Sequence, residues 1–336
     1  MRESTSSLKD KLVALAIIAV LFALPIVALL WMTAVPGASY AGPLPPLTPD
    51  EARLSARLRV HVTAIASVPH NVEHPIELER AARHIEQALA GMGYAVRAQP
   101  FAAGGEQVRN IEVVIDPASP GARTLVVGAH YDSAYGAPGA NDNATGTAAV
   151  IELARNLADL RGKAAVRIRL VLFVNEEPPW FQTPLMGSYV YARRLKRSGE
   201  PVLGMWSLET LGWYSDAPHS QHYPWPLGML YPETGNFVAF VGTTGSRGFV
   251  RNTTGAFRSA ARFPSVGGTA PGFVQGIDWS DHWSFAGEGI PALMVTDTAP
   301  FRYPFYHTVQ DTPDKVDYDR LARVVSGLER TIRAIR

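Results

Sequence analysis

The chain has 336 residues, of which 47% are hydrophobic, and this is enough to bury a large core. Its 31 Lys and Arg residues nearly balance its 30 Asp and Glu residues, so the formal net charge of +1 gives no general attraction to nucleic acid. We therefore expect no nucleic-acid partner. The absence of cysteine excludes disulfides, thiolate metal sites and cysteine nucleophiles, so a tight metal site must use histidine and carboxylate side chains.

An uncharged apolar segment occupies residues 12–35 and is long enough to cross a bilayer core of roughly 30 Å as a helix. Arg2, Lys9 and Lys11 precede this segment, whereas no charge follows it until Asp50. This bias predicts a cytoplasmic N-terminus and places the rest of the chain outside the cytoplasm, in the periplasm or the extracellular space. The sequence predicts three N-terminal segments: cytoplasmic residues 1–11, a transmembrane anchor over 12–35 and a Pro/Gly-rich linker over 36–49.

A cleavable signal peptide is the alternative to the anchor, because small residues follow position 37. Cleavage there would release a secreted protein. The apolar core of a signal peptide is usually only about 7–15 residues, which favours the anchor.

Helical and strand-like patterns alternate after the linker. Apolar residues three and four apart predict helices over 50–67, 76–93, 145–160, 187–199 and 317–336. Short apolar runs predict strands over 94–101, 109–116, 123–130, 166–177, 202–213 and 290–298. This alternation predicts a mostly parallel central sheet with mixed edges and helices on both faces, a three-layer α/β sandwich in one domain over 50–336. The least periodic region, 214–276, predicts long loops.

Ionisable side chains stand where three of the predicted strands end. His130 ends one strand, Glu176 and Glu177 end the next, and Glu209 ends a third. Because ligands bind beyond the carboxyl ends of parallel strands, we expect these side chains at one edge of the sheet. Two adjacent glutamates after an apolar run repel each other and are costly to bury unless a cation stands near.

Two loops add further candidate ligands. Asp142 lies in a stretch with glycines on both sides, which lets the backbone turn tightly. His307 follows the predicted strand 290–298, and Asp132 is placed to hold the ring N–H of His130, as happens for most metal-bound histidines. Each of these residues alone also fits a surface loop or a hydrogen-bonded core position. Their convergence favours a metal site.

The motifs GAHYDS, GANDNATG, NEE, SLETLGW, SDHWSF and YHTVQDTPDKVD follow one another over residues 128–317. In these motifs the chain resembles the M28 family of zinc metallopeptidases. The resemblance implies a di-zinc aminopeptidase that hydrolyses N-terminal residues from peptides. Carried over position by position, it implies two Zn²⁺, or other divalent cations, with these ligands: His130 and Glu209 for one ion, Glu177 and His307 for the other, and Asp142 between them.

The resemblance also implies a mechanism. Two metal ions about 3.5–4 Å apart hold a hydroxide and polarise the peptide carbonyl. Glu176 is implied as the general base that takes the proton from the attacking water and passes it to the departing amine. Asp132, Asp281 and His282 are expected to support the site.

Two positions depart from the family pattern. Glu209 stands where many relatives have aspartate, which changes the reach of that ligand. Ile277 and Trp279 stand near the place where some relatives have a tyrosine that stabilises the oxyanion, so the sequence names no oxyanion donor beyond the metals. Trp213, Trp225 and Trp279 are candidates for the wall of an apolar substrate pocket.

Three other functions remain open at this point. A glutaminyl cyclase has the same fold with a single zinc, and the departure at Glu209 leaves room for it. A carboxypeptidase for acidic peptides would need an assembled group of cations, for which the chain offers Arg251, Arg258, Arg262 and Arg302. A non-catalytic binding module would be expected to have lost ligands, whereas every ligand position here holds a ligating side chain.

Overall fold

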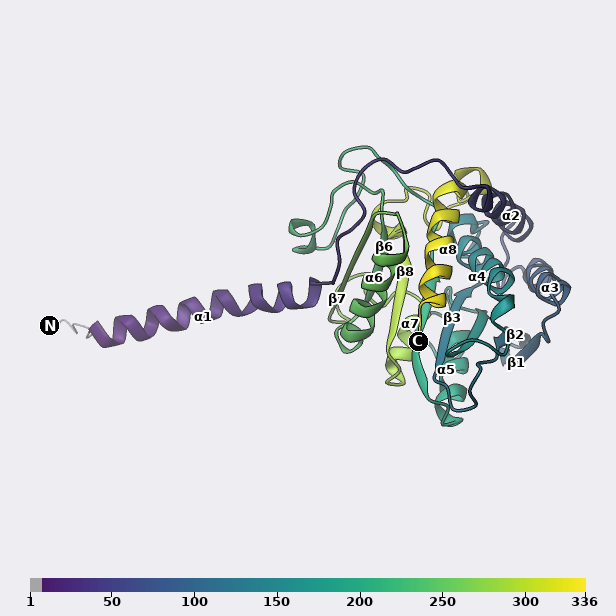
Figure 1. Ribbon diagram of the computed structural model, residues 1–336, viewed down its shortest axis with the longest axis horizontal. Helices are drawn as coiled ribbons and strands as arrows, with labels where there is room; N and C mark the ends of the chain where they lie inside the picture. Colours follow the sequence, from purple (N-terminus) through teal and green to yellow (C-terminus); the bar gives the residue numbers. More distant parts are fainter. Residues whose placement is uncertain (1–7) are drawn as a thin grey trace.

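The computed structural model describes residues 8–336 and shows one sheet with helices on both sides, from which a long N-terminal helix projects (Figure 1). Within these residues the helices are α1 (Leu8–Thr33), α2 (Pro49–Ile65), α3 (Pro75–Gly91), α4 (Thr145–Asn156), α5 (Gly187–Arg197), α6 (Arg247–Ala260), α7 (His282–Gly287) and α8 (Tyr318–Arg333). The strands are β1 (Arg97–Ala103), β2 (Glu106–Ile115), β3 (Thr124–His130), β4 (Arg167–Phe173), β5 (Val202–Glu209), β6 (Val238–Thr243), β7 (Ser265–Ala270) and β8 (Ala292–Thr296).

The eight strands form a single mixed sheet in the order β1-β2-β4-β3-β5-β8-β6-β7. The central strands β4, β3, β5 and β8 are parallel neighbours. At one edge, β1 and β2 pair antiparallel, and at the other β6 runs antiparallel to β8 and parallel to β7. The predicted mostly parallel sheet with mixed edges is confirmed.

Helices cover both faces of this sheet, which makes a three-layer arrangement. On one face, α2, α3, α4, α6 and α8 enclose the larger apolar core. On the other, α5 and α7 pack Tyr191 and Phe285 against Val126, Val171 and Phe173 of β3 and β4. Strand β3 is buried along its whole length because both of its faces are covered.

Local capping fixes where the helices next to the linker and the C-terminus begin. Thr48 and Glu51 form a reciprocal capping box at the start of α2, with Pro49 in the first turn. The carboxylate of Asp317 accepts the backbone N–H of Arg320 at 3.0 Å and caps α8. These caps satisfy backbone donors that the helices themselves leave free.

The region expected to form long loops, residues 214–276, instead contains β6, α6 and β7. The sequence hides β7 because the strand carries two glycines, which have low strand propensity. The packing explains them: a Cβ at Gly267 would lie 2.5 Å from Thr254 Oγ1, and one at Gly268 would lie 2.1 Å from the Tyr231 hydroxyl. Only glycine allows α6 and the loop before β6 to approach this edge strand so closely.

Helix α1 projects from the edge of the sheet beside β7 (Figure 1). Its stretch Asp10–Thr33 has a mean hydropathy of 3.1 over its most apolar window, and none of that window is buried in the protein. By length and composition this helix is able to cross a membrane. Arg2, which contributes to the predicted orientation, lies outside the described residues.

Gly128→Ala is expected to destabilise the fold, because the added Cβ would lie 2.4 Å from Phe173 Cε2 and 2.9 Å from the Val171 carbonyl oxygen. Overpacking of this kind lowers the free energy of unfolding by about 1–3 kcal/mol. Chemical denaturation of the full chain in detergent measures the change. Gly136→Ala is the matched control, since nothing lies within 4 Å of its added Cβ. Equal unfolding free energies in the two variants would contradict the packing around Gly128.

Candidate metal centre

Six ionisable side chains meet beyond the carboxyl ends of the central strands. His130 is the last residue of β3, and Glu209 is the last residue of β5. The other four come from the turn η1 (Ala140–Ala144), from the segment after β4 and from the loop after β8: Asp142, Glu176, Glu177 and His307. The side chain of His307 is 29% exposed, and the other five are buried.

The two carboxylate oxygens of Asp142 face different histidines. Oδ1 lies 3.3 Å from His130 Nε2, and Oδ2 lies 3.0 Å from His307 Nε2. Glu209 Oε2 lies 3.3 Å from the same nitrogen of His130, and Glu177 Oε1 lies 3.3 Å from that of His307. Asp142 therefore stands between two histidine–glutamate pairs.

The spacing of these atoms fits divalent cations. Zinc–ligand bonds of about 2.0–2.2 Å in a tetrahedron put neighbouring ligand atoms about 3.4 Å apart, close to the observed contacts. His130 Nε2, both oxygens of Asp142 and Glu177 Oε1 are buried without any hydrogen bond. Buried polar atoms normally have partners, and these atoms belong to side chains that form the possible metal-holding groups. The donor set of imidazole and carboxylate suits zinc.

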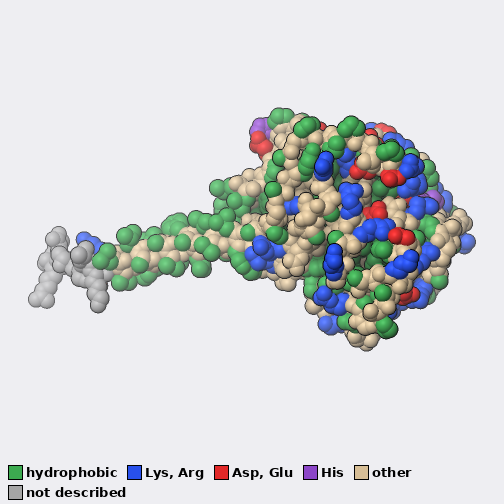
Figure 2. All heavy atoms as spheres, in the orientation of Figure 1, with side chains coloured by type: hydrophobic (Ala, Val, Ile, Leu, Met, Phe, Trp, Pro, Cys, Tyr) green, Lys and Arg blue, Asp and Glu red, His purple; other side chains and the backbone are tan. Residues whose placement is uncertain are grey.

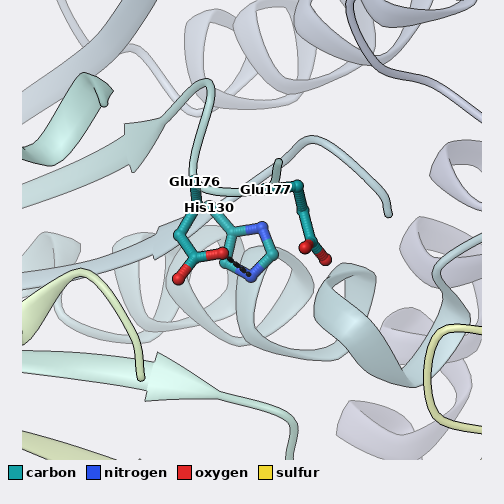
Figure 3. A group of neighbouring side chains, drawn as sticks. All are labelled: His130, Glu176 and Glu177. Carbon is teal, nitrogen blue, oxygen red and sulfur yellow. Dashed lines mark ion pairs between the residues drawn. The ribbon is translucent and has the colours of Figure 1, made fainter. Parts of the chain in front are cut away.

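Glu176 and Glu177 are neighbours in the chain, but their carboxylates lie on different sides of the His130 ring (Figure 3). Glu176 Oε2 is 3.9 Å from His130 Nε2, and His130, Glu176 and Glu177 form one of the groups of side chains that could hold a metal ion. The backbone N–H groups of Glu176 and Glu177 donate to the two carboxylate oxygens of Asp132 at 3.2 and 3.1 Å. Asp132 thus fixes the backbone from which both glutamates project.

The structure gives Asp132 a different contact with His130 from the one expected. The ring Nδ1 is 3.1 Å from the backbone carbonyl oxygen of Asp132 and 3.6 Å from its carboxylate. The carbonyl is therefore the better acceptor for the ring N–H. The carboxylate is already occupied by two backbone donors.

The pKa shifts of the grouped side chains show that negative charge in the site is unfavourable without a cation. Burial raises the pKa of Glu177 and of Glu209 to about 7, and the charge of Asp142 adds to both shifts. Burial likewise raises the pKa of Glu176 well above its usual range. For His307, burial alone would lower the pKa, but the negative charges of the adjacent Asp142 and Glu177 raise it to about 11. A cation bound among these groups would relieve the repulsion between the carboxylates.

Two residues hold the site through contacts that the sequence does not predict. Ser280 Oγ donates to Glu209 Oε2 at 2.7 Å and pairs with Ser207 Oγ, also at 2.7 Å. Asp311 accepts the backbone N–H of Asp142 at 3.1 Å. Both lie inside motifs that the sequence singles out, SDHWSF and YHTVQDTPDKVD, and a polar residue close to a candidate ligand was the only signal available.

Three residues at or beside the ligands have left-handed backbone conformations. Asn175, next to Glu176, has φ 61°, and Thr210, next to Glu209, has φ 46°. His307 itself has φ 56°. Such conformations cost free energy for residues other than glycine and concentrate at functional sites, where surrounding contacts hold them in place.

Asp281 and His282 lie outside the groups of possible ligands found in residues 8–336. His282 Nε2 donates to the Ile277 carbonyl at 2.8 Å, and burial lowers its pKa to about 4, which keeps the ring neutral. Burial raises the pKa of Asp281 to about 7. Their supporting role stays a prediction.

An apolar cavity adjoins the cavity at the candidate ligands. Glu209, Trp279 and Tyr306 line both cavities. The apolar cavity is walled mainly by β6, β7, β8 and the loop before β6, including Phe237, Val241, Val266, Met294 and Leu227. The Tyr306 ring stacks on His307 with centroids 3.9 Å apart.

Of the three tryptophans expected to form a pocket wall, Trp279 does so. Trp213 instead packs against Tyr303 and Phe305. Trp225 is 88% exposed at the surface.

Comparisons with known proteins identify relatives of this chain in sequence and in fold. Residues 110–332 match the model of peptidase family M28. The chain is 38% identical over 269 residues to the uncharacterized protein YfbL of Escherichia coli (strain K12), which covers 77% of this chain and 81% of that protein. It is 28% identical over 221 residues to leucine aminopeptidase 1 of Arthroderma otae, covering 61% of this chain and 53% of that protein. The chain thus spans about half the length of this fungal relative.

Two solved structures share the fold at low sequence identity. The aminopeptidase from Aneurinibacillus sp. strain AM-1 has a TM-score of 0.62 at 18% identity, over 84% of this chain and 95% of that chain. A glutaminyl cyclase from Fimbriiglobus ruber has a TM-score of 0.61 at 18% identity, over 90% of this chain and 100% of that chain. These two likenesses establish the fold and leave the reaction open. The family match over residues 110–332 shows that this chain belongs to peptidase family M28, the family of hydrolytic metallo-exopeptidases that its sequence predicts.

Proposed function

We propose that this chain is a zinc-dependent aminopeptidase that removes N-terminal residues from peptides. In this proposal one zinc is held by His130 and Glu209, the other by Glu177 and His307, and Asp142 bridges the two. The observation that carries the proposal is the position of Asp142, whose two oxygens each face a different histidine at 3.3 and 3.0 Å. A site for one ion would leave the second histidine–glutamate pair without a purpose.

When bound, the two ions supply Lewis acidity toward a peptide carbonyl and lower the pKa of a water molecule. Glu176 lines the same cavity outside both histidine–glutamate pairs, so its carboxylate is free to accept the proton of the attacking water. The same carboxyl group can then pass that proton to the departing amine.

Tyr306 supplies the hydrogen-bond donor that the sequence does not reveal. Its side chain lines the cavity together with Asp142 and Glu177. Burial, with the charges of these carboxylates, raises the pKa of the phenol well above its usual range, so it stays protonated. A protonated phenol at this place donates a hydrogen bond to the negative oxygen that develops on the carbonyl.

The charge of the cavity walls supports an aminopeptidase over a carboxypeptidase. In the described part of the chain, no lysine or arginine lines either cavity, whereas four carboxylates line the metal cavity. A C-terminal carboxylate needs a cationic partner, and neither cavity offers a lysine or arginine side chain from residues 8–336 for it. The adjoining apolar cavity suits an apolar first side chain.

The arginines that a carboxypeptidase would need are engaged elsewhere. Arg302 is buried, and its Nη1 donates to the carbonyls of Gly235 and Phe237 at 3.0 and 2.9 Å. Arg251 donates to a carbonyl just after α1, and Arg258 donates to a carbonyl of the linker. These three side chains therefore form no acidic-substrate pocket at the candidate metal centre.

We also propose that α1 remains attached as a membrane anchor, with the peptidase domain outside the cytoplasm. The length and hydropathy of the helix and the charges before it support this arrangement. Contacts of residues 31–39 with β7 and α6 support retention of the segment, because they make the end of the apolar helix part of the folded domain.

Ser280→Ala is expected to lower zinc affinity about 10–100-fold, because it removes the hydrogen bond that orients Glu209. Competition with a metal-sensitive chelator measures this affinity. Ser284→Ala is the matched control: its hydroxyl is equally buried, but it pairs with Ser188 at 2.8 Å instead of with a ligand. Equal zinc affinity in the two variants would contradict the role of Ser280.

Glu176→Gln is expected to lower kcat by about 10²–10⁴-fold while zinc content is unchanged, because a proton acceptor is lost and no ligand is. His307→Ala is expected to lose zinc as well as activity. Elemental analysis and turnover of a leucyl peptide, measured on the same samples, separate these outcomes. A fully zinc-loaded His307→Ala variant, or a Glu176→Gln variant with normal turnover, would be inconsistent with the assigned roles.

A panel of peptides tests the reaction itself. A peptide with N-terminal leucine is expected to be cleaved, and at least about tenfold faster than one with N-terminal aspartate. Acetylation of the N-terminus is expected to abolish cleavage, whereas amidation of the C-terminus leaves it intact. Release of ammonia from an N-terminal glutamine without chain cleavage would instead identify a glutaminyl cyclase.

A further inference from the structure

The end of α1 is bound to the domain through side chains of α6 and β7. Arg247 donates from Nε to the Trp31 carbonyl at 2.8 Å, and its guanidinium lies 4.0 Å from the centre of the Trp31 ring. Thr269 donates to the Met32 carbonyl at 3.1 Å, and Arg251 donates to a carbonyl just beyond the helix. Because the helix end is held at several points, the same face of the domain is always turned toward the apolar helix.

The linker that follows α1 adds to this attachment. Arg258 donates to the Gly37 carbonyl at 2.6 Å, and the backbone N–H of Ser265 donates to Ser39 Oγ at 2.8 Å. The first residues after the helix therefore run along α6 and β7 and do not act as a free tether. A domain held in this way stays next to the surface from which the helix emerges.

A loop of the domain lies beside the end of α1. This loop, residues 223–231, contains the short helical turn η3 (Leu227–Met229) and is called the η3 loop below. Leu230 and Tyr231 line one hollow together with Thr33 at the end of α1. In Figure 1 the loop extends toward the side of the domain from which α1 projects.

The η3 loop exposes large apolar side chains on this side. Trp225 is 88% exposed, Met229 is 79% exposed and Leu230 is 41% exposed. Figure 2 shows green side chains gathered near the junction of α1 with the domain, with blue Lys or Arg side chains close to the helix end. Soluble surfaces rarely gather apolar side chains in this way without a partner.

We propose that the η3 loop, together with Arg247 and Arg251 of α6, is a second membrane contact that seats the domain on an anionic bilayer. This inference rests on the proposed anchoring by α1. Trp225 is of the residue type that prefers the interface between headgroups and acyl chains, and Met229 adds apolar area to bury there. The two arginines lie at the helix end, at the level of the lipid phosphates.

The position of the exposed side of the η3 loop favours a bilayer over a soluble partner. An apolar surface that binds a soluble partner can lie anywhere on a domain, whereas this one lies beside the point where α1 leaves. Trp31, one of the contacts of Arg247, is itself an aromatic residue in the last turn of the apolar helix, where aromatic side chains mark the membrane interface. The end of the apolar helix and the arginine of α6 that contacts it thus lie at the same expected depth, the membrane interface.

The inner side of the same loop forms a wall of the candidate substrate pocket. Tyr223, Leu227 and Tyr231 line the apolar cavity that reaches Glu209 and Tyr306. A bilayer that holds the outer side of the loop therefore also holds this wall in place. The pocket would take its final shape at the membrane surface.

The absence of cysteine from the chain allows a direct test with single cysteines. Met229→Cys in the full chain is labelled with an environment-sensitive fluorophore and placed, one copy per disc, in nanodiscs of phosphatidylcholine with some phosphatidylglycerol. Lipids that carry a quencher just below the headgroup then report contact. Ile76→Cys on α3 is the matched control, because Ile76 is also 79% exposed but lies at the opposite end of the domain (Figure 1).

Quenching at position 229 is expected to exceed that at position 76 by at least about twofold. Changing Arg247 and Arg251 to Gln is expected to reduce the quenching at 229 in anionic discs. Equal quenching at 229 and 76 overturns the proposal. A signal at 229 that arises only in discs with two copies overturns it as well, and identifies a surface for self-association.

A third label separates this proposal from the anchor on which it rests. Leu21→Cys lies at the middle of α1, so its fluorophore is quenched by lipids that carry a quencher deep in the acyl chain if the helix crosses the bilayer. Quenching at 21 without quenching at 229 overturns the second contact and leaves the anchor intact. Absence of quenching at 21 overturns the anchor itself.

Discussion

Repulsion among buried carboxylates is the constraint on which this structure depends. Two unit charges 4 Å apart interact by about 4 kcal/mol at an effective dielectric constant of 20, and burial adds the cost of removing each charge from water. Without ions, protonated histidines supply part of the compensating charge. Two divalent cations would supply all of it and would be bound by neutral histidine rings. They balance the formal charge of the four carboxylates gathered here: Asp142, Glu176, Glu177 and Glu209.

Hydrogen bonds to the backbone of the ligand-bearing segments hold the acidic side chains together despite this repulsion. Asp132 binds two consecutive N–H groups after β4, and Asp311 binds the N–H of Asp142. Asn143 ties η1 to β5: its Nδ2 donates to the Leu208 carbonyl at 2.8 Å, and its Oδ1 accepts the N–H of Thr210 at 3.1 Å. Parallel strands bring these segments to one edge, and the hydrogen bonds then fix each ligand before any ion arrives.

The sequence predicts the fold class and the convergence of ligands because both follow from local patterns: apolar periods, strand ends and short motifs. It misses contacts that only tertiary structure creates. Ser280 and Glu209 are 71 residues apart, and Asp142 and Asp311 are 169 apart, so no spacing rule pairs them. Strand β7 is missed because its glycines are required by close contacts with distant segments, whereas strand propensity disfavours glycine.

The η3 loop shows that the apolar character of a residue in a non-periodic loop does not predict whether its side chain is buried or exposed. Leu227 faces the cavity beside the metal centre, while Trp225 and Met229 of the same short loop face outward. A loop with apolar side chains on both sides has no face left for water, and its exposed side carries a cost in solution. That cost disappears if the outer face meets lipid. Anchoring and pocket shape would then be coupled, since the helix that tethers the domain also brings the outer side of the η3 loop to the bilayer.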